Sequence, residues 1–259
     1  MRCAMSETRD RILGMNLIGG VLCLDFTNTI GWRGGSDSDE KLYDYEDLIV
    51  WGRHAGALSE RHGRRLLKQA ASEPARAWAT YQQAIALREA LYRAFSSLSS
   101  GRSPQPIDVA QINAVVGDAY RHLRLALRPS SGLAPRPSSG LAPRPSFELA
   151  PRPPSGLAPS GDGFAWEWHE ADGSLELPVW MVARSAAELL TSDSLGRVRE
   201  CAGEKCDWLF LDASRNRSRR WCDMAACGNR AKARRNYARR RSGAATRGAA
   251  ARTGRGREA

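Results

Sequence analysis

Two cysteine pairs, Cys201-Ala-Gly-Glu-Lys-Cys206 and Cys222-Asp-Met-Ala-Ala-Cys227, decide how the last quarter of this 259-residue sequence can fold. Four residues separate the members of each pair, and fifteen residues separate the pairs. This spacing is typical of a tetrahedral zinc site with four thiolate ligands. We therefore predict one zinc ion at Cys201, Cys206, Cys222 and Cys227. Because cysteines fill all four positions, the ion is expected to be structural rather than catalytic.

Other uses of these cysteines are two disulfides, unpaired structural thiols and redox sensing. The sequence opens without a signal peptide, so we expect a reducing cytoplasm, where disulfides are rare. Paired spacing beside glycine and charged residues argues against unpaired thiols. No histidine follows His169, which excludes a finger with two cysteines and two histidines.

The residues around the cysteines offer little apolar surface. The run from Trp208 to Leu211 is strand-like, and with Trp221 it is expected to form a small core beside the metal. The helix expected from Cys227 to Arg241 has only a thin stripe of alanines and Tyr237. Metal ligation, worth about 10–16 kcal/mol in small zinc modules, is therefore expected to stabilise this segment.

Positive charge is concentrated in the same part of the sequence. Residues 197–259 hold 18 lysines and arginines against 6 acidic residues, a net charge of +12, whereas residues 1–196 hold 21 against 22. A basic helix on a zinc platform beside a neutral domain predicts binding to a phosphate backbone. The candidate nucleic-acid contacts are Arg215, Arg217, Arg219, Arg220, Asn229, Arg230, Lys232, Arg234, Arg235, Arg239, Arg240 and Arg241. For Asn229, a local cap that fixes the turn at Cys227 is an equal alternative.

Two motifs resemble known families. Cys227-Gly228-Asn229-Arg230, preceded by Arg220-Trp221-Cys222 and Ser214-Arg215-Asn216, resembles the CGNR zinc finger, which is named for that tetrapeptide. Gly19-Gly20 and the run Leu24-Asp25-Phe26-Thr27-Asn28-Thr29 resemble the opening of the ABATE domain, which precedes the finger in that family. The resemblance implies zinc at the four cysteines, DNA binding, and a role as a bacterial, stress-related transcription regulator.

The N-terminal part reads mainly as helices. Leu17 to Thr29 is apolar and β-prone, and predicts a buried strand. Helices are expected from Tyr45 to Leu58, from Ser59 to Ala71, after Pro74, and after a cap at Asp108. A strand around Trp166, a hairpin turn at Asp172-Gly173 and a helix from Val179 to Thr191 follow.

Asp25, Asn28, Trp32 and Arg33 are candidates to line a pocket for a small-molecule ligand. Turn capping by the Asp and Asn side chains and packing of the tryptophan are the commoner roles for such residues. The scattered histidines have no ligand-spaced partners, and no phosphate loop or nucleophile motif is present in the sequence. We therefore predict that the protein is not an enzyme.

Residues 128–160 repeat the unit Arg-Pro-Ser-Ser-Gly-Leu-Ala-Pro with a period of eight residues. One leucine per unit cannot bury a core, so we predict a disordered insertion, with a Pro-rich docking site as the alternative. Residues 242–259 read as a disordered basic tail, and no apolar run approaches the length of a membrane span.

The predicted fold class is α+β. A helix-rich domain over residues 1–196, with a small sheet from the Val21 and Trp166 regions, precedes a zinc module at 197–241. The function hypothesis is a cytoplasmic DNA-binding transcription regulator whose N-terminal domain senses a ligand or mediates assembly. The alternative is an RNA- or ribosome-associated zinc protein, because Arg-rich helices serve RNA equally. The sequence leaves the ligand, the DNA target and the oligomeric state open.

Overall fold

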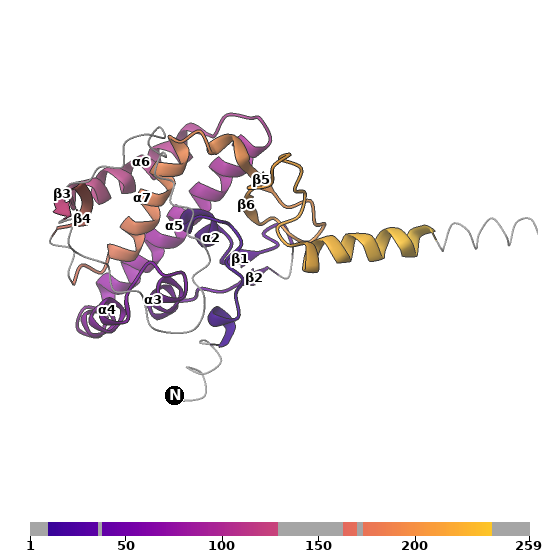
Figure 1. Cartoon of the computed structure of the whole chain (residues 1–259). Coiled ribbons are helices and arrows are strands. Elements are labelled where there is room, and N and C mark those ends of the chain that lie inside the picture. The colour runs from indigo at the N-terminus through magenta and orange to yellow at the C-terminus, as the bar shows by residue number, and fades with distance from the viewer. Residues whose placement is uncertain (1–9, 36–37, 129–162, 170–172, 240–259) are drawn as a thin grey trace, which may run out of the picture.

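The N-terminal domain is a bundle of helices around one long central helix. The computed structural model describes residues 10–35, 38–128, 163–169 and 173–239 (Figure 1). Its helices are α2 (Leu22–Thr27), α3 (Tyr45–His54), α4 (Glu60–Ser72), α5 (Pro74–Ser99), α6 (Pro106–Arg121) and α7 (Leu177–Leu190). The predicted repeat insertion, apart from the backbone of Arg128, and the predicted basic tail lie outside the described residues.

Helices α3 to α7 confirm the helices predicted from the sequence. The ends of these helices follow ordinary capping rules. Asp44 and Ser59 cap α3 and α4 by accepting hydrogen bonds from the amides of Asp47 and His62. Pro74 and Pro106 stand in the first turns of α5 and α6, where a missing N–H costs nothing. Asp108 is not the predicted cap; it is buried and forms an ion pair with Arg93 of α5 at 2.7 Å.

The strand predicted over Leu17 to Thr29 is wrong, because residues Leu22–Thr27 form helix α2. An apolar run of this length fits either a buried strand or a buried helix, and periodicity cannot separate the two. Cys23, Leu24 and Phe26 are fully buried, and α2 contacts α5 and α7. Tertiary packing on several sides therefore overrides the local β-propensity.

The sheets in the described part of the chain are three separate antiparallel pairs. They are β1 (Ile30–Gly31) with β2 (Asp39–Glu40), β3 (Leu123–Arg128) with β4 (Gly163–Trp168), and β5 (Val198–Glu200) with β6 (Leu209–Leu211). The Trp166 strand pairs with β3 and not with the Val21 region, which is helical. Asp172 lies outside the described residues, and the described residues that follow it do not form the expected hairpin: Gly173 has a φ of +95°, and α7 begins at Leu177.

The zinc module begins where the bundle ends. A short 3₁₀ turn, Leu195–Arg197, leads into β5, and β5 pairs with β6 so that Val198 lies opposite Leu211 and Glu200 opposite Leu209. A π turn, Met224–Gly228, then starts a helix over residues 229–239, which we call the basic helix. Figure 1 shows this helix projecting away from the bundle.

Candidate metal centre and basic surface

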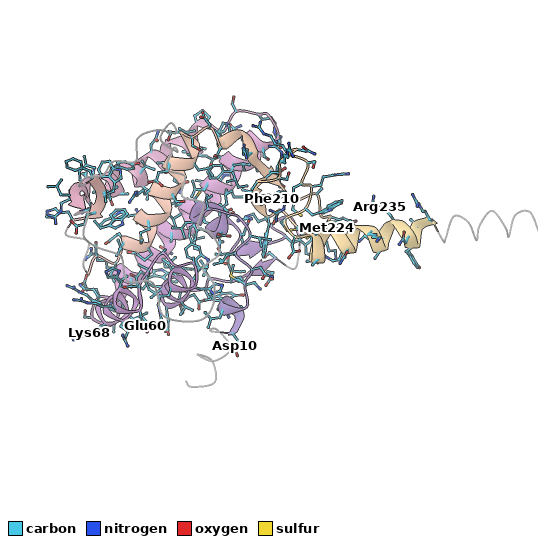
Figure 2. All side chains as sticks on the ribbon, in the orientation of Figure 1. Asp10, Glu60, Lys68, Phe210, Met224 and Arg235 are labelled. Carbon is cyan, nitrogen blue, oxygen red and sulfur yellow. The ribbon has the colours of Figure 1, made fainter. Side chains whose placement is uncertain are left out.

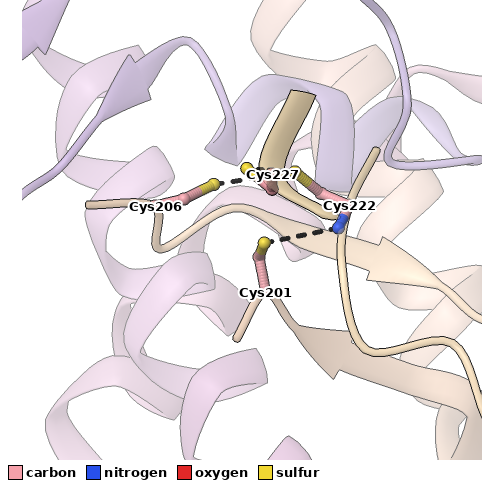
Figure 3. Close-up of side chains that lie close together, drawn as sticks. All are labelled: Cys201, Cys206, Cys222 and Cys227. Atoms are coloured by element: carbon pink, nitrogen blue, oxygen red, sulfur yellow. Dashed lines mark hydrogen bonds between the residues drawn. The ribbon is translucent and has the colours of Figure 1, made fainter. Parts of the chain in front are cut away.

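The four predicted cysteine ligands lie together. Cys201 follows β5, Cys206 precedes β6, and Cys222 and Cys227 flank the start of the π turn (Figure 3). All four sulfurs lie within 4.8 Å of one another, with the Cys206 and Cys222 Sγ atoms 3.6 Å apart and the Cys222 and Cys227 Sγ atoms 3.7 Å apart. Tetrahedral zinc with bonds of about 2.3 Å requires sulfurs about 3.8 Å apart. The donor set and spacing therefore fit one structural zinc ion.

Backbone contacts hold the two cysteine loops against each other. The Cys222 amide donates to Cys201 Sγ at 3.3 Å, and the Ala202 amide donates to the Arg220 carbonyl at 2.9 Å. Gly203 lies inside the first loop, where an added Cβ would lie 3.1 Å from Cys206 Cβ and 3.3 Å from Cys227 Sγ. A side chain at residue 203 would therefore press on the cluster.

Without a cation, the four thiols cannot all lose their protons. Hydrogen bonds from the thiols of Cys206 and Cys222 stabilise a thiolate at Cys201 and lower its pKa to about 2. The bond to Cys201 raises the pKa of Cys206 to about 12, and bonds to Cys201 and Cys206 raise the pKa of Cys222 as well. Several thiolates cannot coexist here unless a metal replaces the shared protons.

Asp223 fixes the second cysteine loop, a role that the sequence analysis missed. Its Oδ1 accepts hydrogen bonds from the amides of Ala225 at 2.6 Å and Ala226 at 3.4 Å. Asn229 donates from Nδ2 to the Ala225 carbonyl at 3.0 Å, which is a contact within the turn. An Asp directly after Cys222 and before a helical segment is a capping signal that the sequence does carry.

Strand β6 joins the module to the N-terminal domain. Leu209 and Leu211 are buried in the main core, and α2 contacts β6. Phe210 points to the other side, into a small core with the cysteines, Trp208 and Trp221. The prediction of a small core beside the metal is therefore confirmed for Phe210, Trp208 and Trp221, whereas Leu209 and Leu211 belong to the larger core because alternate residues of a strand face opposite sides.

Asn28 binds the backbone of this strand. Its Nδ2 donates to the Leu209 carbonyl and its Oδ1 accepts from the Leu209 amide, both at 2.8 Å, and Asn28 is fully buried. The Leu211 amide donates to the Gly19 carbonyl at 2.8 Å. Asp25 in turn accepts a hydrogen bond from the Gly19 amide at 2.8 Å. The turn before α2 and the end of α2 therefore hold β6 in place.

Trp32 and Arg33 contact the first cysteine loop. The amides of both residues donate to the Asp207 carboxylate, and the Lys205 ammonium lies 4.4 Å from the centre of the Trp32 ring. The Arg33 guanidinium stacks on Tyr92 at 3.8 Å and pairs with Asp207 and Glu89. Burial lowers the pKa of Arg33, against the pull of these carboxylates. Trp32 adopts a φ of +51°, which is uncommon for a bulky residue.

Asn28, Trp32 and Arg33 thus bind residues of the zinc module directly, and Asp25 is connected to it through Gly19. A cavity of about 210 Å³ in the described structure is lined instead by Leu13, Val50, Arg53, His54, Leu58 and Glu60. A ligand site at Asp25, Asn28, Trp32 and Arg33 stays a prediction.

The arginines of the loop before Cys222 differ in how they are held. Arg219 donates from Nε to the Trp221 carbonyl at 3.0 Å and from Nη2 to the Cys222 carbonyl, and its guanidinium stacks on Phe210. Arg220 lies over the Trp221 ring. Arg215 and Arg217 are exposed at the loop tip, and their side chains have no ion pair among the described residues. Arg219 therefore braces the metal site, whereas Arg215 and Arg217 remain available to a partner.

The basic helix has two different sides. Arg230 donates to Cys227 Sγ at 3.0 Å, which raises the pKa of Arg230, and Arg234 forms an ion pair with Glu204 of the first loop. Lys232, Arg235 and Arg239 are exposed and follow steps of three and four residues on the opposite side (Arg235 is labelled in Figure 2). We call these three residues the basic face. Arg240 and Arg241 lie outside the described residues.

Two family models match the chain. Residues 20–193 match the ABATE model, described as "Putative stress-induced transcription regulator", and residues 197–240 match the CGNR zinc finger. A search of curated proteins found no match. Within the described residues, no helix is both long and apolar enough to cross a membrane.

Proposed function

Because the chain belongs to the ABATE family and carries a CGNR zinc finger, we propose that it is a regulator that binds DNA through the zinc module. The observation that supports this proposal most strongly is the basic helix, which is anchored at one end to the cysteine cluster and exposed along the rest of its length. In this proposal the protein is a regulator and not an enzyme, and its N-terminal domain senses a ligand or mediates assembly.

The contacts of the helix suggest which side meets DNA. Arg230 and Arg234 are held by Cys227 and Glu204, so their guanidinium groups already have partners within the module. Lys232 and Arg235 of the basic face form none of the hydrogen bonds or ion pairs among the described residues, Arg239 is exposed on the same side, and a helix of this width fits the major groove. In this proposal Arg215 and Arg217, which are exposed on the loop before Cys222, add phosphate contacts.

A salt titration tests the assignment. Binding of the full chain to duplex DNA and to a structured RNA of equal length is measured over a salt series, for wild type and for Lys232→Ala/Arg235→Ala/Arg239→Ala. Each lost phosphate contact is expected to reduce the slope of log affinity against log salt by about one unit, and loss of base contacts to weaken sequence preference.

Helix α4 provides a matched control. Arg61, Arg64 and Lys68 are exposed and have the same spacing as the basic face (Lys68 is labelled in Figure 2). Arg61→Ala/Arg64→Ala/Lys68→Ala removes the same charge from the N-terminal domain. If both triple variants bind like wild type, the basic face is not the nucleic-acid surface. Tighter and more selective binding to RNA would favour the RNA-associated alternative, as would co-purification of RNA instead of discrete peaks of genome occupancy.

A further inference from the structure

The ribbon formed by β3 and β4 has one strongly apolar face. Leu125 lies directly opposite Trp166, and Leu127 lies opposite Phe164. Directly opposed residues of an antiparallel pair share a face, and alternate residues along a strand return to it. Leu125, Leu127, Phe164 and Trp166 therefore form one surface, which we call the ribbon face.

The bundle covers only the inner end of this ribbon. Leu123 and Trp168 form the innermost pair, and the Trp168 ring stacks on Trp180 of α7 with centroids 6.3 Å apart. Farther out, the exposed fractions are 58% for Leu125, 67% for Leu127, 70% for Phe164 and 47% for Trp166. The outer two pairs thus extend beyond the core that supports the inner pair.

Tyr120 of α6 enlarges the surface. Its ring meets Trp166 edge-on at 6.4 Å and is itself exposed. Single exposed apolar side chains are ordinary, but a contiguous group of five large ones marks an interaction site. Since a buried aromatic side chain covers about 150–250 Å², these five residues present several hundred Å², the same order as the roughly 800 Å² per partner of a standard interface.

Among the described residues, charges near the ribbon face are paired. Arg124 pairs with Glu167 at 3.0 Å on the reverse face of the ribbon, and Arg121 pairs with Asp118 at 2.7 Å on α6. The net charge of +12 belongs to residues 197–259 instead. Figure 1 shows the ribbon at the opposite end of the molecule from the basic helix. A second copy can therefore approach this end without bringing the two basic segments together.

We propose that the ribbon face is a self-association surface, on which a second copy of the chain packs its own ribbon face about a two-fold axis. Such an interface uses the same patch on both copies, and neighbouring charges that are already paired are compatible with it. The two basic helices then lie at the outer ends of the dimer, where one chain can bind nucleic acid while the other is held nearby. The association itself does not depend on the proposed DNA binding.

The mass of the full chain, measured by sedimentation equilibrium without nucleic acid over a wide concentration range, tests this proposal. Wild type is expected to show a monomer–dimer equilibrium. Leu127→Thr/Phe164→Thr keeps β-propensity but removes apolar surface, so its dissociation constant is expected to rise at least about tenfold with little change in melting temperature. Ile107→Thr/Val109→Thr, two exposed apolar positions on α6, is the control and is expected to dimerise like wild type.

Three outcomes would overturn the proposal. One is a wild-type protein that stays monomeric at all concentrations, and another is a ribbon variant that dimerises as tightly as wild type. The third concerns residues 129–162, which connect the two strands: if deletion of 136–159 converts a monomer into a dimer, the ribbon face is covered by the chain's own insertion and not by a second copy.

Discussion

The zinc module has two parts, which lie on either side of the same four cysteines and differ in what covers them. One part is the base, formed by β5, β6 and the first cysteine loop, and the other is the basic helix. Leu209 and Phe210 are fully buried, and Asn28 and Asp207 tie the base to the N-terminal domain. Residues 232–239 of the helix are exposed on all sides. Because isolated helices shorter than roughly 12–15 residues are marginal in water, the helix depends on its anchored end. The base is thus held by a core, and the helix by the metal site.

The largest effect is expected from removing a zinc ligand. Cys206→Ser or Cys222→Ser should release the ion and unfold the basic helix, since ligation contributes about 10 kcal/mol or more in comparable modules. Elemental analysis measures the zinc content. Hydrogen exchange compares each variant with wild type, and exchange should become faster in residues 229–239 more than in β6.

Cys23 provides the control for this experiment. It is fully buried between helices, and burial raises the pKa of its thiol to about 12. Cys23→Ala should leave one zinc per chain. Stoichiometric zinc in both Cys206→Ser and Cys222→Ser, with unchanged exchange in the helix, would show that the four-cysteine site is wrong.

The next largest effect on stability is expected from replacing Asn28, which binds the base, and it is compared with replacing Asn229, at the start of the basic helix. Asn28→Ala leaves the Leu209 amide and carbonyl buried without partners, so the free energy of unfolding should fall by about 2–4 kcal/mol. Asn229→Ala removes one exposed hydrogen bond and should lower it by less than about 1 kcal/mol. Urea denaturation of both variants checks the ranking, and equal losses would mean that the base is not the better-held half.

The smallest effect is expected from a change outside both halves. Deleting residues 136–159 should leave the free energy of unfolding within about 1 kcal/mol of wild type, because each doubling of loop length costs only about 0.6 kcal/mol. Zinc content and nucleic-acid affinity should also be unchanged. A drop in melting temperature of many degrees would show that the repeats contribute to the folded domain.

The sequence predicted what local patterns encode. Cysteine spacing gave the metal cluster, and apolar periodicity with proline and capping residues gave helices α3 to α7. It did not predict α2, whose helical state is decided by burial against α5 and α7. Nor did it predict the bond between Asn28 and Leu209, because these residues are 181 positions apart and no local signal links them. Functional candidates such as Arg219 and Arg230 likewise show their bracing contacts only once the cluster has formed.

Strand β6 also bears on how this protein can be divided. The family matches meet between residues 193 and 197, which suggests a convenient place to cut. A fragment that starts there would expose Leu209 and Leu211 to water. In the other fragment, α2 would lack its neighbour β6, and Asn28 would lack its hydrogen-bond partner. The finger is therefore a poor candidate for grafting onto another protein, and fragments for biochemical work should keep the two family segments in one piece.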